Sequence, residues 1–216
     1  MSLDEGQTLA LVGANGAGKT TLLRSIAGAH PVTSGSIRFD GRDITAVPAH
    51  TRVRQGIAMV PEGRRLFADL TVRENLLLAG GHGRDGRWTV DAVVEAFPML
   101  APLLDQRAST LSGGQQQAAA IGRGLMSNPR LLLLDEVSLG LAPVAVEAVY
   151  ESLRGLSGTS TAIVLVEQDL NRAIAFSDRV TCLLEGQVVL EGDAASMDRD
   201  RVTQAYFGLG SRGSSR

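Results

Sequence analysis

Hydrophobic residues along this chain follow two kinds of spacing. Short apolar runs, typical of strands buried on both faces, occupy residues 7–13, 56–61, 130–136 and 160–167. Elsewhere apolar residues recur every three or four positions, which predicts helices over residues 18–28 and 144–156. Strands that alternate with helices predict an α/β domain with a mainly parallel sheet covered on both faces.

Two further segments have strand-like patterns of a different kind. Residues 35–41, "GSIRFDG", alternate between apolar and polar side chains, which predicts a half-buried strand. Residues 178–192 contain two apolar runs separated by Glu185–Gly186. This arrangement predicts a final hairpin with a tight turn at these two residues.

The middle of the chain is helical in its pattern. From Thr71 to Met126 the apolar residues keep helical spacing, and Thr71 with Glu74 forms an S/T-x-x-E capping box that marks a helix start. We therefore predict a helical subdomain at residues 71–126, inserted into a core formed by residues 1–70 and 127–209. The glycine- and serine-rich residues 210–216 are expected to be a disordered tail.

Composition and charge exclude several classes of protein. The chain has 216 residues, 44% of them hydrophobic, and a net charge of −2, so we expect no general binding to nucleic acid. Cys182 is the only cysteine, which rules out an internal disulfide and favours a reducing compartment. The start "MSLDEGQ" lacks the basic region of a signal peptide, and no apolar run approaches the roughly 20 residues of a membrane span. We expect a cytoplasmic protein.

The segment "GANGAGKT", residues 13–20, matches the phosphate-loop pattern G-x-x-x-x-G-K-[ST] between a predicted strand and a predicted helix. Glycines let the backbone curl around an oxyanion, and the helix start adds partial positive charge. We expect Lys19 to reach the β and γ phosphates, Thr20 to bind Mg²⁺ and Thr21 to contact a further phosphate oxygen. The predicted ATP-binding residues are Gly13, Ala14, Asn15, Gly16, Ala17, Gly18, Lys19, Thr20 and Thr21.

An acidic pair follows the apolar run "LLLL" at residues 131–134. Asp135 is expected at the carboxyl end of a buried strand, where open α/β sheets bind ligands. We predict that Asp135 holds Mg²⁺ through water and that Glu136 accepts a proton from the attacking water. Together with the phosphate loop, this pair predicts a nucleoside triphosphatase.

The segment "LSGGQ", residues 111–115, places a second candidate anion-binding loop at a predicted helix start. With both loops, nearly the whole chain resembles the nucleotide-binding domains of ATP-binding cassette (ABC) systems. The resemblance implies that two such domains pair head to tail, each signature loop covering the ATP held by the other domain. The residues expected to act in this way are Ser112, Gly113, Gly114 and Gln115.

Within that family, the chain is most similar to the ATP-binding subunits of branched-chain amino acid importers. The segments that carry this likeness are "MVPEGRRLF", "LSGGQQQ", "SLGLAP" and "VLVEQD". In "VPEGRRLF", Glu62 stands where most ABC proteins have glutamine, and in "VEQD", Gln168 stands where most have histidine. The resemblance implies catalytic roles for Glu136, Lys19, Gln168 and Glu62, and Mg²⁺ ligation by Thr20, Asp135 and Glu62.

The same resemblance implies partners. These are a second ABC ATPase domain, identical or not, two membrane permease subunits and, indirectly, a solute-binding protein outside the cell. The segment Gly63–Thr71, with Arg64, Arg65 and Phe67, is expected to contact the permeases and hold the chain at the inner face of the cell membrane.

Three points stay open at this stage. Urea and short-amide importers are close relatives, so the solute can differ. A nucleotide-dependent binding module with little hydrolysis is an alternative to an ATPase. The family also has an aromatic residue before the phosphate loop that stacks on adenine, whereas here the first aromatic is Phe39. We therefore expect either an N-terminal truncation or a start site assigned too far downstream, together with a reduced antiparallel part of the sheet and weak ATP binding by the chain alone.

Overall fold

The structure is a computed structural model that describes residues 1–156 and 159–207. The tail expected to be disordered, residues 210–216, lies outside the described residues.

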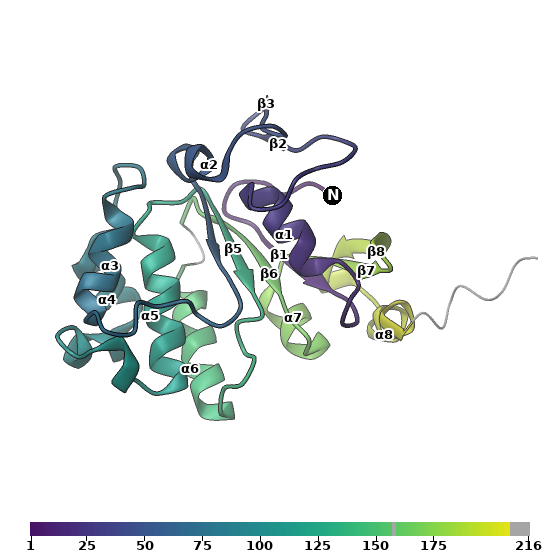
Figure 1. Ribbon diagram of the computed structural model, residues 1–216. Helices are drawn as coiled ribbons and strands as arrows, with labels where there is room; N and C mark the ends of the chain where they lie inside the picture. Colours follow the sequence, from purple (N-terminus) through teal and green to yellow (C-terminus); the bar gives the residue numbers. More distant parts are fainter. Residues whose placement is uncertain (157–158, 208–216) are drawn as a thin grey trace, which may run out of the picture.

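A six-stranded sheet forms the centre of the molecule (Figure 1), with strand order β4-β5-β6-β1-β7-β8. The strands are β1 Thr8–Val12, β4 Ile57–Val60, β5 Leu131–Asp135, β6 Ala162–Val166, β7 Arg179–Leu184 and β8 Gln187–Asp193. The first five in spatial order run parallel, and β8 pairs antiparallel with β7. The predicted mainly parallel sheet and the final hairpin are confirmed.

Both faces of the sheet are covered by helices, which explains the unbroken apolar runs. In β5, Leu133 packs in the cluster that contains Leu23 of helix α1 (Lys19–Ala27). The neighbouring Leu132 and Leu134 pack in a second cluster with helices α5 (Gly113–Leu125) and α6 (Pro143–Arg154). Helix α7 (Leu170–Phe176) and helix α8 (Arg199–Phe207) complete the covering around β7, where Cys182 is buried.

The predicted strand over residues 35–41 is wrong in its length. Only Arg38–Phe39 (β2) forms a strand, and it pairs with Arg42–Asp43 (β3) in a separate two-stranded sheet. Asp40 and Gly41 adopt positive φ angles of 53° and 73°, which reverses the chain after two residues. Helix α2 (Ala49–Gln55) then leads into β4.

The segments between residues 71 and 126 fold as helices α3 (Val72–Gly80), α4 (Val90–Ala96) and α5, with short 3-10 turns at Pro98–Leu103 and Ala108–Thr110. The capping box at the start of α3 is confirmed, because Glu74 N–H donates to Thr71 Oγ1 and Thr71 N–H donates to Glu74 Oε2 at 2.7 Å.

A glycine in the middle of α5 allows these helices to approach each other closely. A Cβ at Gly122 would lie 2.6 Å from Val93 Cγ1 of α4 and 3.2 Å from Leu76 Cδ2 of α3. Glycine lowers the intrinsic stability of a helix by about 1 kcal/mol relative to alanine, and here the close packing explains its presence.

Candidate functional site

The predicted phosphate loop connects β1 to α1. Gly13 has a φ of 149°, and a side chain there would collide with the carbonyl oxygen of Leu183 on β7. Gly18 is the N-cap of α1 in the left-handed region, with φ 98°. The first N–H groups of α1 have no earlier partner within the helix, so the loop and the helix start can bind an anion.

Lys19 is buried across this loop, with only 5% of its surface exposed. Its Nζ donates to the carbonyl oxygens of Gly13 at 2.7 Å and Ala14 at 3.0 Å. Burial lowers the pKa of Lys19, although the nearby Glu136 and Asp135 carboxylates act in the opposite direction. The ammonium group is thus fixed beside the loop, and a phosphate could replace the carbonyl oxygens as its partner.

Asp135 ends β5 next to the start of α1. Thr20 Oγ1 donates to Asp135 Oδ1 at 3.0 Å, while the buried Oδ2 has no hydrogen-bond partner among the described residues. Burial raises the pKa of Asp135, which is 1% exposed. A hydroxyl and an unpartnered carboxylate oxygen side by side are the hard oxygen donors that suit Mg²⁺.

Glu136 and Gln168 follow neighbouring strands and meet beyond their carboxyl ends. Gln168 Nε2 donates to Glu136 Oε2 at 2.9 Å. Glu136 adopts a left-handed backbone conformation with φ 53°, which is uncommon for a residue with a side chain. Such strained conformations concentrate at functional sites.

These groups line one open cavity of about 450 Å³. Its lining residues are Asn15, Gly16, Gly18, Lys19, Thr20, Thr21, Glu62, Glu136, Leu139 and Gln168. Of the other predicted phosphate-loop residues, Gly13 and Ala14 supply the carbonyl groups that hold Lys19, and the Ala17 carbonyl accepts the N–H of Gly186. Asp135 lies beneath the cavity and reaches it through Thr20.

Leu139 was not predicted as a site residue. It is 46% exposed and follows the acidic pair by three positions. No sequence pattern distinguishes it from a surface leucine, because its place beside Glu136 depends on the turn after β5.

The signature segment lies elsewhere in the chain. Ser112 is exposed and is the N-cap of α5, in a reciprocal capping box with Gln115. Gly114 is buried, and a Cβ there would lie 2.7 Å from the Cβ of Ala145 on α6. The close packing of α5 against α6 therefore requires glycine at this position. None of the four predicted signature residues lines the cavity around Lys19.

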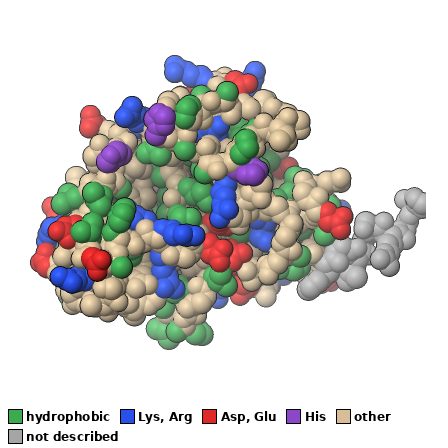
Figure 2. Space-filling view, in the orientation of Figure 1, with side chains coloured by type: hydrophobic (Ala, Val, Ile, Leu, Met, Phe, Trp, Pro, Cys, Tyr) green, Lys and Arg blue, Asp and Glu red, His purple; other side chains and the backbone are tan. Residues whose placement is uncertain are grey.

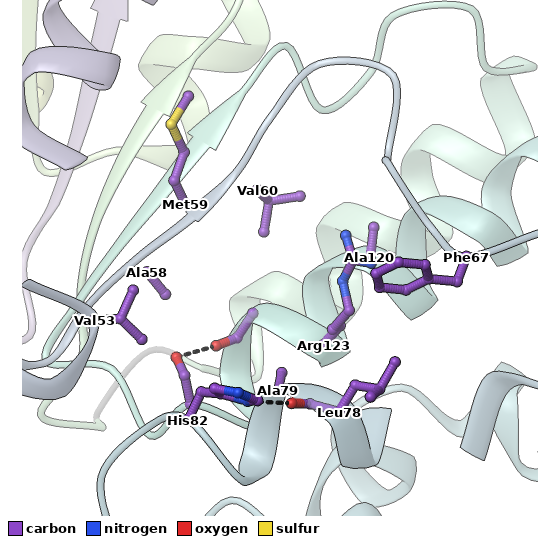
Figure 3. A pocket seen from close by; sticks show the side chains of 12 residues that line it. Val53, Ala58, Met59, Val60, Phe67, Leu78, Ala79, His82, Ala120 and Arg123 are labelled. Atoms are coloured by element: carbon purple, nitrogen blue, oxygen red, sulfur yellow. Dashed lines mark hydrogen bonds between the residues drawn. The ribbon is translucent and has the colours of Figure 1, made fainter. Parts of the chain in front are cut away.

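A second cavity, of about 290 Å³, lies between the sheet and the helices of residues 71–126 (Figure 3). Val53 of α2, Met59 of β4 and Leu78 of α3 line it, together with Arg123 of α5 and Phe67. The Arg123 guanidinium lies 5.8 Å from the centre of the Phe67 ring. We call this cavity the apolar groove.

The surface beside the apolar groove is hydrophobic. Hydrophobic side chains gather over α3 in the space-filling view (Figure 2), where Leu77 and Leu78 are 54% and 44% exposed. Phe67 is 56% exposed. Clustered exposed apolar side chains mark interaction surfaces.

Comparison with known proteins places the chain in a family. A family model for ABC transporters matches residues 1–138. Over 211 residues the chain is 44% identical to the high-affinity branched-chain amino acid transport ATP-binding protein BraG of Pseudomonas aeruginosa, covering 96% of this chain and 91% of that protein. The chain belongs to the ABC transporter family.

Other ABC proteins agree with this assignment. The probable branched-chain amino acid transport ATP-binding protein LivF of Archaeoglobus fulgidus is 39% identical over 188 residues, covering 86% of this chain and 80% of that protein. The ADP conformation of MJ1267, an ATP-binding cassette of an ABC transporter, matches with a TM-score of 0.80 and 27% identity, covering 96% of this chain and 90% of that chain.

As an ABC cassette, the chain is an ATP-binding protein and an ATPase. The expected fold class is confirmed. Within residues 1–156 and 159–207, no helix combines the length and the apolar character needed to cross a membrane.

Proposed function

We propose that the chain binds and hydrolyses ATP to energise an importer of branched-chain amino acids. The convergence of Lys19, Glu136 and Gln168 on one cavity, beside Thr20 and Asp135, carries the proposal for hydrolysis. The likeness to BraG and to LivF supports the solute class, and neither is described as a urea or short-amide importer.

Each of three residues of the cavity has a separate role in the proposed reaction. Lys19 releases its two carbonyl partners and neutralises charge on the γ phosphate. Glu136 accepts the proton of the attacking water, and Gln168 holds the Glu136 carboxylate through its amide. Because glutamine cannot act as a cation near neutral pH, Gln168 serves as a polar contact and not as a proton shuttle.

Thr20 and Asp135 would hold Mg²⁺, and Glu62, on the same cavity wall, is a third oxygen donor. Mg²⁺ bound there would supply positive charge next to the phosphate oxygens.

The signature segment is proposed to complete the ATP site of a second cassette. Ser112 is exposed at the start of α5 and does not line its own chain's cavity, so this exposed helix start can face another molecule. MJ0796, a bacterial ABC transporter cassette described as dimeric, matches this chain with a TM-score of 0.78 and 26% identity, covering 91% of this chain and 89% of that chain. Two chains of this kind would clamp two ATP molecules between them.

The apolar groove is proposed to receive the membrane permeases. The segment after Glu62 connects the ATP cavity to this groove, because Glu62 lines the cavity and Phe67 lines the groove. Between them, Arg64 donates to Gln116 of α5 at 2.9 Å. Movement of this segment on ATP binding would thus reach both the groove and the signature helix. Docking there would hold the chain at the inner face of the membrane.

The test replaces the proposed base. The Glu136→Gln variant should bind Mg-ATP and associate in its presence, while phosphate release falls by at least about a hundredfold. The matched control is Glu147→Gln, the same change at an exposed position on α6, which should keep the parental rate. Parental phosphate release by Glu136→Gln would refute the assignment of the base.

A further inference from the structure

A buried acidic residue lies directly behind the cavity and has no part in the chemistry described so far. Glu167 follows the last residue of β6 and is 1% exposed. Its Oε1 accepts a hydrogen bond of 2.6 Å from the hydroxyl of Tyr150, which lies on α6 and is also 1% exposed. A buried carboxylate is costly unless its oxygens are hydrogen-bonded.

The second oxygen of Glu167 points to the segment that carries Gln168. Glu167 Oε2 accepts the backbone N–H of Gln168 at 2.9 Å, and the N–H of Asp169 lies 3.5 Å away. Gln168 in turn donates its side-chain amide to Glu136. One unbroken series of hydrogen bonds therefore runs from Tyr150 through Glu167 and Gln168 to the proposed base.

The ring of Tyr150 makes packing contacts that are separate from the hydrogen bond of its hydroxyl. The ring meets that of Phe176 edge to face, with centroids 5.1 Å apart and an interplanar angle of 88°. The guanidinium of Arg172 lies 5.5 Å from the centre of the Tyr150 ring. Burial raises the pKa of Tyr150, and the adjacent Glu167 carboxylate adds to this shift, so the hydroxyl keeps its proton and remains the donor.

The residues of α6 around Tyr150 are apolar, with Val146, Val149 and Leu153 in the same core cluster as Tyr150. An apolar pair would fill such a space without the desolvation cost of a carboxylate. Buried hydrogen-bond networks of this kind fix one arrangement of the groups that they join.

We propose that Tyr150 and Glu167 are positioning residues that orient Gln168 toward Glu136. Glu167 fixes the backbone of Gln168, and Tyr150 fixes Glu167. The amide then holds the Glu136 carboxylate in the position from which it takes the proton of water. The proposal rests on the proposed roles of Glu136 and Gln168.

A double-mutant cycle on the full chain tests it, with phosphate release from Mg-ATP as the assay. The variants are Tyr150→Phe, which removes only the hydroxyl, Gln168→Ala, and the two combined. If Tyr150 acts through Gln168, Tyr150→Phe should lower kcat about fivefold with KM within about twofold, because loss of orientation affects the transition state more than ATP binding. In the Gln168→Ala background the same change should have no further effect on kcat.

The packing control is Phe176→Leu. This variant removes the edge-to-face contact with Tyr150 and leaves the hydrogen bonds in place. It should lower the thermal midpoint as much as Tyr150→Phe does or more, while kcat stays at the parental value.

Three results would overturn the proposal. The first is a parental kcat in Tyr150→Phe, and the second is that Tyr150→Phe lowers kcat in the Gln168→Ala background by the same factor as in the parent. The third is that Phe176→Leu lowers kcat in proportion to its loss of thermal stability. The Glu136→Gln variant separates these results from failure of the proposed function. If Glu136→Gln is inactive and Tyr150→Phe is unaffected, only the positioning role is wrong. If Glu136→Gln is fully active, the base itself is misassigned.

Discussion

Replacing Asp135 by asparagine should stabilise the nucleotide-free protein although it destroys the proposed Mg²⁺ site. The carboxyl group is buried, and its Oδ2 accepts no hydrogen bond from any described residue. Burial raises the pKa of Asp135, Glu136 and Glu62 add to this shift, and the hydrogen bond from Thr20 opposes it without cancelling it. Folding therefore shifts the proton equilibrium of Asp135 toward the protonated form, relative to the unfolded chain.

The sign of the pH dependence follows from the raised pKa. The contribution of Asp135 to stability is fully present below its unfolded pKa of about 3.9 and is lost as the pH rises through the higher folded value. At pH 8 the ionised carboxylate therefore lowers stability, and asparagine removes the charge while keeping the oxygen that accepts from Thr20. Each unit by which the folded pKa of Asp135 exceeds the unfolded pKa corresponds to about 1.4 kcal/mol, and asparagine removes this cost of the buried charge. For a chain of this size, a gain of about 1.5 kcal/mol corresponds to a rise of roughly 3–6 °C in the thermal midpoint.

The assay is thermal unfolding in EDTA without nucleotide, at pH 8 and near pH 4. Asp135→Asn should unfold at a higher temperature than the parent at pH 8, and the difference should shrink near pH 4. Asp69→Asn, at an exposed position, is the control and should change neither midpoint. With Mg-ATP added, the parent should be stabilised and Asp135→Asn should not. A lower midpoint for Asp135→Asn at pH 8 without nucleotide would refute the reasoning, because it would mean that the charged form is stabilised by its surroundings.

Two further substitutions test the packing and the docking surface. Gly122→Ala places a Cβ 2.6 Å from Val93 Cγ1, so overpacking of about 1–3 kcal/mol should exceed the helix-propensity gain of about 1 kcal/mol. Urea denaturation should therefore show a net loss of stability. The control Gly81→Ala, which has open space around the new Cβ, should leave stability unchanged. Leu78→Asp, in the apolar groove, should abolish co-purification with the permeases and leave the ATPase activity of the chain alone unchanged. The control Val188→Asp, at a similarly exposed apolar residue of β8, should co-purify with the permeases as the parent does. Unchanged co-purification of Leu78→Asp would exclude the groove as the docking site.

The sequence predicted those features that depend on neighbouring residues. The apolar runs of β1, β4, β5 and β6 identify buried strands because both faces of each strand must be apolar. The capping box at Thr71 is a contact between residues three positions apart, so it can be recognised from the sequence. The phosphate loop has the same property, since its glycines and Lys19 act within eight residues.

The failed strand at residues 35–41 shows the limit of such patterns. Alternation of apolar and polar residues there indicated a strand, but the turn at Asp40–Gly41 ends it after two residues. Aspartate followed by glycine favours a tight turn, and at Asp40–Gly41 this preference outweighs the alternating pattern.

By itself, the sequence determined the parallel α/β architecture, the phosphate loop and the acidic pair, because each can be recognised from a pattern of residues close together in the chain. Only the tertiary structure decided that Gln168 holds Glu136, that Tyr150 reaches Glu167 behind them and that Gly122 lets α5 approach α3 and α4. Those contacts join residues far apart in the chain, and they depend on how strands and helices stack. Local sequence patterns do not specify how closely strands and helices pack against each other. The contacts of Tyr150 and Glu167 behind the cavity could therefore be found only from the three-dimensional structure.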